Sequence, residues 1–138
     1  MPSFAEFAGA WTLSRRIEDH RAGATARFEG TARLDPVEAG LAYSEEGQLQ
    51  MPGQPPIRAE RRYLWVKNGA QVSVFFDDGR PFHSFIPGDD TPGAAHWCDP
   101  DQYDVAYDFS AWPHWTARWR VHGPRKDYTL TSHYAPAP

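Results

Sequence analysis

Six tyrosines are the residues of this chain whose type and placement most clearly point to chemistry. Side chains of a β-strand alternate between two faces, and this parity directs all six toward the inward face of the predicted strands. A phenol placed inside a protein needs a hydrogen-bond partner or costs several kcal/mol. The pattern therefore predicts a barrel with a polar cavity of ligand size, lined by Tyr43, Tyr63, Tyr103, Tyr107, Tyr128 and Tyr134.

Three charged residues, Arg15, Glu45 and Arg61, share these inward faces. Arginine stays charged inside a protein and binds a carboxylate or phosphate through two hydrogen bonds. A glutamate beside an apolar wall can have a raised pKa, which would let Glu45 act as an acid or a base. The alternative is structural: an Arg–Glu ion pair is buried at one end of the barrel, and the phenols bond to the backbone.

A second group of candidate functional residues consists of His83, His96 and Cys98. His96 and Cys98 are two residues apart and point the same way on a strand, so with His83 they could bind zinc or copper. They could also pair a thiol nucleophile with a histidine base, or a histidine could serve as a base or ligand donor in the tyrosine cavity. The sequence holds no Cys-x-x-Cys or His-x-x-x-His motif, so we expect no metal and no cofactor.

The segment from Gly123 to Tyr128 is a predicted hairpin that carries two cations. Arg125 could clamp an anion at the barrel mouth. The alternative is a tight turn with a surface ion pair from Lys126 or Arg125 to Asp127, which would contribute little to stability.

About ten short strands with turn signals between them are needed to position these residues. The hairpins follow one another closely, which favours an all-β, up-and-down antiparallel barrel over a sandwich. Ser3 and Glu6 predict a capping box for one short N-terminal helix. The strand around Phe82 has apolar residues on both faces, so its parity is ambiguous. If Phe75 and Phe85 faced outward, they would suit a homodimer.

Length, charge and cysteine content narrow the class of protein. The 138 residues suffice for one domain with its own core, spanning residues 1–138. A net charge of −4 gives no reason to expect nucleic acid or an anionic membrane as a partner. No signal peptide is recognisable at the start, and the single Cys98 excludes an internal disulfide. These features predict a cytoplasmic location.

Several motifs resemble those of known families. Gly9-Ala10-Trp11 opens the first strand and is similar to the Gly-x-Trp start of lipocalins and other calycins. That resemblance implies a Trp11 that closes the barrel bottom, with Arg118 or Arg125 packed on it. The chain also resembles an uncharacterised bacterial family of small calycin-like domains, through the segments 78–83, 96–103 and 123–128. That resemblance implies a calycin-like fold in the cytoplasm and no particular activity.

Two further families are relevant to the cavity. Nitrobindin-like haem barrels have a Gly-rich signature in the first strand, and this chain has Thr12-Leu13-Ser14-Arg15 there, which argues against haem. Phenolic acid decarboxylases resemble this chain in site composition, since they are cofactor-free barrels that use Tyr, Arg and Glu.

The leading functional hypothesis is that a small aromatic or amphipathic anion binds inside the barrel. Its alternatives are a cofactor-independent lyase or isomerase that uses the same cavity, and an interaction module with a filled core. We expect ligand contacts from Arg15, Tyr43, Arg61, Tyr63, Tyr107, Tyr128 and Arg125. The candidate catalytic residues are Glu45, His83, His96 and Tyr103.

Overall fold

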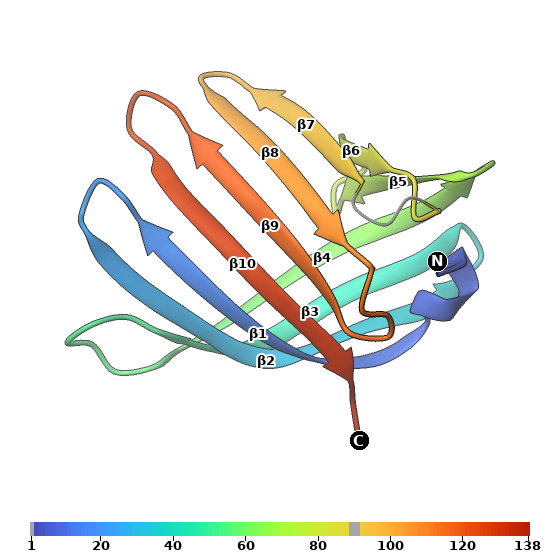
Figure 1. The fold of residues 1–138 in the computed structure, drawn as a ribbon, viewed down its shortest axis with the longest axis horizontal. Helices are drawn as coiled ribbons and strands as arrows, with labels where there is room; N and C mark the ends of the chain where they lie inside the picture. Colours follow the sequence, from blue (N-terminus) through green and yellow to red (C-terminus); the bar gives the residue numbers. More distant parts are fainter. Residues whose placement is uncertain (1, 89–91) are drawn as a thin grey trace.

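The computed structural model describes residues 2–88 and 92–138. A short 3-10 helix, η1 (Phe4–Phe7), precedes ten strands (Figure 1). These are β1 (Gly9–Asp19), β2 (Ala24–Val37), β3 (Gly40–Gln50), β4 (Ile57–Asn68), β5 (Gln71–Phe76), β6 (Pro81–Phe85), β7 (Gly93–Cys98), β8 (Asp101–Asp108), β9 (Trp115–His122) and β10 (Asp127–Pro136). At the N-terminus, the Ser3 backbone N–H donates to Glu6 Oε1 at 3.0 Å.

The strands form one antiparallel sheet that curls into a nearly closed barrel. Each strand pairs with its neighbours in sequence, and β1 pairs with β10 to join the two ends of the chain. The order is β6-β5-β4-β3-β2-β1-β10-β9-β8-β7, so β6 and β7 form its two edges and share no ladder among the described residues. The predicted all-β up-and-down barrel is confirmed, except that its ring stays open between β6 and β7.

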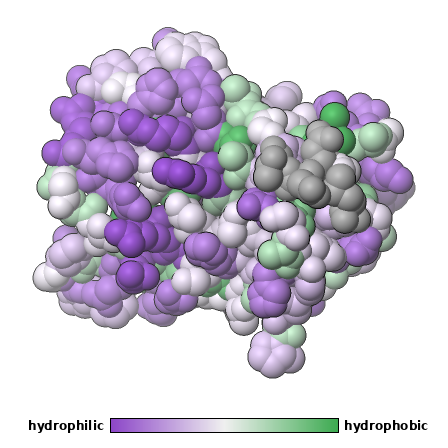
Figure 2. Space-filling model, viewed as in Figure 1, coloured by the Kyte–Doolittle hydropathy of each residue, from purple (hydrophilic) through white to green (hydrophobic). Residues whose placement is uncertain are grey.

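Alternation along the strands explains why they form a barrel wall. On β2, Phe28 and Leu34 are buried, while Arg27, Glu29 and Arg33, on the alternate positions of the strand, are exposed. This period of two places one apolar row on the inside and one charged row in solvent. The outer surface seen in Figure 2 is accordingly mainly hydrophilic.

An aromatic cluster around η1 closes one end of the barrel. Phe7 is fully buried, and its ring contacts Phe109, Trp112 and Trp115 at centroid distances of 5.5, 5.0 and 5.5 Å. Trp11 donates from Nε1 to the Phe7 carbonyl at 2.9 Å. Its ring contacts Trp112 and Trp115 at 5.5 and 5.8 Å.

The expectation that Trp11 closes the barrel bottom is therefore confirmed, but the expected arginine on its ring is wrong. Arg118 and Arg125 are both exposed, and two indoles take the predicted place: Trp112, between β8 and β9, and Trp115, the first residue of β9. An indole buries more apolar surface than a guanidinium can without needing a counter-charge.

Two glycines bring β2 and β3 unusually close together. Gly30 and Gly47 are paired across the two strands, and a Cβ on either would collide with the backbone of the other strand. Ala32, the next inward residue of β2, is also small and fully buried. The inward side chains of β2 at Gly30 and Ala32 therefore project little into the barrel. A long side chain from β1 can pass over them to reach β3.

In residues 2–88 and 92–138, Phe75 and Phe85 do not form the outer apolar face that would suit a homodimer, because Phe85 is buried inside the barrel. Phe85 is 2% exposed and its ring lies 4.4 Å from that of Tyr107. None of the helical segments in the described part of the chain has the length and apolar character needed to cross a membrane.

Candidate functional site

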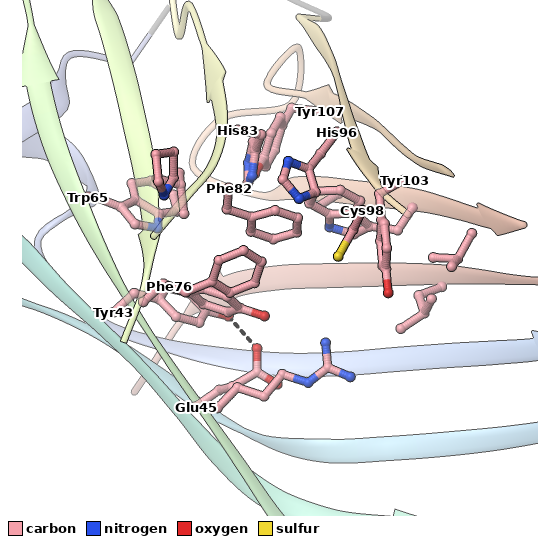
Figure 3. A pocket seen from close by; sticks show the side chains of 18 of the residues that line it. Tyr43, Glu45, Trp65, Phe76, Phe82, His83, His96, Cys98, Tyr103 and Tyr107 are labelled. Atoms are coloured by element: carbon pink, nitrogen blue, oxygen red, sulfur yellow. Dashed lines mark hydrogen bonds between the residues drawn. The ribbon is translucent and has the colours of Figure 1, made fainter. Parts of the chain in front are cut away.

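The barrel encloses a cavity of about 630 Å³, within the range of small-molecule sites. All six tyrosines line it, as the parity of the strands predicts. Every predicted site residue except Arg125 also lines it: Arg15, Tyr43, Glu45, Arg61, Tyr63, His83, His96, Tyr103, Tyr107 and Tyr128. Figure 3 shows Tyr43 and Glu45 on one side of this cavity, and His83, His96, Tyr103 and Tyr107 on the other.

Arg15 and Glu45 form a buried, bidentate ion pair that spans the small inward residues of β2. Arg15 donates from Nη1 to Glu45 Oε2 at 2.6 Å and from Nη2 to Oε1 at 3.0 Å. Its Nε donates to Ser132 Oγ at 2.7 Å. Tyr43 donates its hydroxyl to Glu45 Oε1 at 2.6 Å (Figure 3), and the Tyr43 and Tyr134 hydroxyls lie 2.8 Å apart. We call Arg15, Tyr43, Glu45, Ser132 and Tyr134 the Arg15–Glu45 network.

The network holds Glu45 ionised. Burial alone would raise the pKa of Glu45, but hydrogen bonds and charge from Arg15 outweigh burial and lower the pKa below its usual 4.5. The expectation of a raised pKa for Glu45 is therefore wrong, because the Arg15 guanidinium stabilises the charged carboxylate despite its burial. Burial raises the pKa of Tyr134 to about 12 and that of Tyr43 well above 10, so both phenols stay protonated.

A β-bulge on β6 resolves the ambiguous parity of that strand. Val74 of β5 pairs with His83, and Phe75 pairs with Pro81, which leaves Phe82 without a partner. An extra residue of this kind re-aims the side chains around it. Phe82 and His83 are consecutive, yet both line the cavity.

His83 is a buried, neutral ring at the cavity wall. Its Nε2 lies 2.7 Å from the Tyr107 hydroxyl, and its Nδ1 has no hydrogen-bond partner among the described residues. Burial, together with the nearby His96, lowers the pKa of His83 to about 3. A histidine with this pKa is a hydrogen-bonding group at neutral pH and a weak proton acceptor.

His96, Cys98 and Tyr103 lie on β7 and β8. His96 and Tyr103 are half-buried and directly paired across the two strands, while Cys98 is exposed. In residues 2–88 and 92–138, no group of three or more His, Cys, Asp or Glu side chains is placed to hold a metal ion. His83, His96 and Cys98 therefore share a cavity wall without forming the metal cluster that was one reading of their spacing.

Stacked aromatic rings, which sequence parity did not identify as a unit, form a slot beside the histidines. The Phe82 ring stacks on Phe76 at 4.5 Å and on Trp119 at 4.9 Å, with interplanar angles of 24° and 9°. His83 and His96 meet the same ring edge-on at 4.6 and 5.3 Å. The sequence feature that could have indicated this slot is the presence of apolar residues on both faces of the strand around Phe82.

Solvent-exposed lining residues mark the mouth of the cavity: Arg61, Arg80, Pro81, Trp97 and Cys98. Arg61 lies directly opposite Glu45 on the neighbouring strand and has no ion-pair partner in the described part of the chain. Arg80 bonds to Asp78 at 2.7 Å and stacks over Phe76 at 5.3 Å. Trp97 is 60% exposed, which is unusual for an indole.

Arg125 is exposed and does not line the cavity. The alternative, an ion pair from Lys126 or Arg125 to Asp127, is wrong, because Asp127 pairs with Arg120 of β9 and Lys126 pairs with Asp101 at 3.0 Å. Both partners come from other strands, so sequence neighbours gave no guide to the pairing.

The fold and the cavity together define a small, nearly closed antiparallel β-barrel with a polar, aromatic-walled interior. The chain belongs to the family of unknown function DUF6314, whose sequence profile matches residues 7–136. The expected membership in an uncharacterised family is thus confirmed, while the bacterial origin stays a prediction.

Among solved structures, the chain is similar to the S-type phycobiliprotein lyase CPES from Guillardia theta. The TM-score is 0.68 at 10% identity, covering 98% of this chain and 90% of that one. It is also similar to mFAP1, a redesigned β-barrel bound to DFHBI, with a TM-score of 0.46 at 12% identity over 97% and 98% of the two chains. The first similarity shows a shared fold alone, and the second is too distant to support an argument. A comparison with curated proteins found no match.

Proposed function

We propose that this barrel binds a small aromatic or amphipathic anion in its cavity. The observation that carries the proposal is Arg61, a cation without an ion-pair partner among the described residues, at the mouth of an aromatic-walled cavity of about 630 Å³. Aromatic walls stack on a planar ligand, and a guanidinium binds its anionic group. The other arginine deep in the cavity, Arg15, is already neutralised by Glu45.

Two of the four candidate catalytic residues, Glu45 and His83, are poorly suited to lyase or isomerase chemistry, which favours binding. The CPES barrel is a lyase by name, so the fold accommodates an enzyme. In this chain, however, Glu45 is held ionised by Arg15, and burial lowers the pKa of His83 to about 3. A general acid or base works best with a pKa near the working pH, and neither group meets that condition. An interaction module with a filled core has no support either, since the cavity is open.

The test uses 8-anilinonaphthalene-1-sulfonate, an aromatic anion whose fluorescence rises in apolar surroundings. We expect it to bind the wild type, and Arg61→Ala to bind it roughly fivefold more weakly, since a partly exposed ion pair contributes about 1 kcal/mol. Added salt should reduce the affinity of the wild type for the dye. It should therefore also reduce the difference in affinity between the wild type and Arg61→Ala. Fluorescence titration at two salt concentrations measures both effects.

Arg62→Ala is the matched control, because Arg62 is the next residue of β4 and lies on the opposite face. It removes the same charge from the protein but should leave the affinity at the wild-type value. Equal weakening by both substitutions would mean that general charge, not the cavity mouth, attracts the anion.

The single cysteine offers an independent readout of the same site. Cys98 is exposed and lines the cavity mouth, so iodoacetamide should alkylate it readily in the free protein. Saturating 8-anilinonaphthalene-1-sulfonate should slow this reaction severalfold by covering the mouth. Mass spectrometry follows the modification, and glutathione with the same dye controls for direct effects on the reagent. An unchanged rate at saturation would place the dye elsewhere on the protein.

A further inference from the structure

The Phe82 side chain lies inside the cavity and stacks on aromatic rings from two of its walls. Its ring centroid is 4.5 Å from that of Phe76 and 4.9 Å from that of Trp119, with interplanar angles of 24° and 9°. Tyr63 stacks on Phe82 as well, at 5.7 Å and 24°. All four side chains line the cavity, and Figure 3 shows the Phe82 ring directly beside that of Phe76.

These stacking partners come from strands that lie far apart in the sheet. Tyr63 of β4 pairs directly with Phe76 of β5, so these two rings belong to one wall. Trp119 belongs to β9, and five strands separate β9 from β5 along the sheet. Phe82 therefore spans the cavity from one wall to the other, and the space that it fills has the thickness of one aromatic ring.

Polar rings border the edge of Phe82. His83 and His96 meet its ring at centroid distances of 4.6 and 5.3 Å, with interplanar angles of 88° and 89°. Tyr103 approaches at 6.2 Å and 84°. A phenyl ring carries no hydrogen-bonding group, so Phe82 makes no use of this polar border.

The backbone holds Phe82 weakly. Val74 pairs with His83 and Phe75 pairs with Pro81, so Phe82 is the extra residue of the bulge and has no cross-strand partner of its own. Its strand, β6, is one edge of the sheet. Bulges often lie next to functional sites, and segments with few backbone hydrogen bonds open locally at a lower free energy. The half-buried Phe82 side chain can therefore leave its position without breaking a cross-strand pair.

We propose that the space between Phe76 and Trp119, filled here by Phe82, is the binding site for the aromatic ring of the ligand, which displaces the Phe82 side chain. This inference rests on the proposed function and narrows its ligand class to anions whose aromatic part is flat and no thicker than one ring. The incoming ring regains the stacking that Phe82 gives up. Arg61 lies two residues from Tyr63 on the same face of β4, so it can meet the anionic group of a ring bound there.

Displacement makes Phe82 a competitor of the ligand. The apparent affinity is reduced by the fraction of protein in which the site is vacant, so removing the competing ring should raise it. A fixed aromatic wall would behave in the opposite way, because its removal takes a stacking partner from the ligand.

The experiment compares 2-naphthoate, a flat aromatic anion, with decahydro-2-naphthoate, whose saturated rings are puckered and thicker. We expect Phe82→Ala to bind 2-naphthoate about tenfold more tightly than the wild type, because the ligand no longer displaces a buried phenyl ring. Decahydro-2-naphthoate should gain much less, since it is too thick for the site. Adding Trp119→Leu to Phe82→Ala should remove the gain for 2-naphthoate by removing one wall. Isothermal titration calorimetry measures all these affinities.

The direction of the change separates the two roles of Phe82. Weaker or unchanged binding of 2-naphthoate by Phe82→Ala would overturn the proposed site. An equal gain for both probes would also overturn it, because a larger cavity alone would explain that result. Failure of the wild type and of Phe82→Ala to bind either probe or 8-anilinonaphthalene-1-sulfonate would overturn the proposed function itself.

If Phe82→Ala does not fold, nuclear magnetic resonance of the wild type with 2-naphthoate provides the test. A ligand in the proposed site should show nuclear Overhauser effects to both Phe76 and Trp119. Its protons should also shift upfield, because they lie between two stacked rings. Bound 2-naphthoate without contacts to both residues would overturn the proposed site.

Discussion

Replacing Glu45 with glutamine is expected to lower the free energy of unfolding by about 3–5 kcal/mol, the loss seen when one partner of a buried ion pair is removed. Arg15 is 7% exposed and would remain buried without its counter-charge. Tyr43 would also lose a charged acceptor for its hydroxyl. Urea unfolding at pH 7, followed by tryptophan fluorescence, measures the difference.

Glu46→Gln provides the matched control for this substitution. Glu46 is the next residue of β3, on the outer face, and its partner Arg58 is exposed. Removing that surface pair should change stability by less than about 1 kcal/mol. Similar losses in the Glu45 and Glu46 variants would show that the Arg15–Glu45 network contributes no more than a surface pair.

Acidification should lower the free energy of unfolding of the wild type by protonating the Glu45 carboxylate. Because the folded pKa of Glu45 is lowered from 4.5, its contribution is fully present above 4.5 and is lost as pH falls toward the folded value. Glu45→Gln has no such carboxylate, so its stability should vary less with pH in this acidic range.

The second large effect is a loss of stability between pH 8 and pH 5 that originates from His83. Its pKa is about 3 in the folded protein against 6.5 for an ordinary histidine, so the unfolded chain binds a proton that the folded chain excludes. The stability is fully present above 6.5 and falls as pH drops toward 3. At pH 5 the loss from this one ring should be roughly 2 kcal/mol.

Urea unfolding at both pH values in wild type and His83→Gln isolates this contribution. The wild type should lose roughly 2 kcal/mol more than His83→Gln over the interval, because glutamine does not titrate. His133→Gln, which changes an exposed histidine, should behave like wild type. An identical loss in wild type and His83→Gln would mean that His83 is protonated as easily in the folded protein as in the unfolded one.

The barrel and the residues of its inner face could be predicted because they depend on local alternation alone. A period of two in each strand directs the six tyrosines inward whatever their neighbours are, and turn residues separate the strands. This is why Tyr43 and Tyr128, far apart in sequence, were both placed correctly in the cavity.

The contacts within the cavity could not be predicted, because they depend on register and on irregular backbone. Arg15 of β1 reaches Glu45 of β3 over Gly30 and Ala32, the small inward residues of β2. Strand parity does not reveal which residues of neighbouring strands will lie side by side. His83 faces the cavity because of a bulge at Phe82. A bulge breaks the period on which the inference rests.

A crystal structure of the complex with 8-anilinonaphthalene-1-sulfonate tests the central claim most directly. The account predicts the dye inside the barrel, with its rings among the aromatic walls and its sulfonate toward Arg61. Dye bound only on the outer surface, with the cavity left to solvent at saturating concentration, would contradict it.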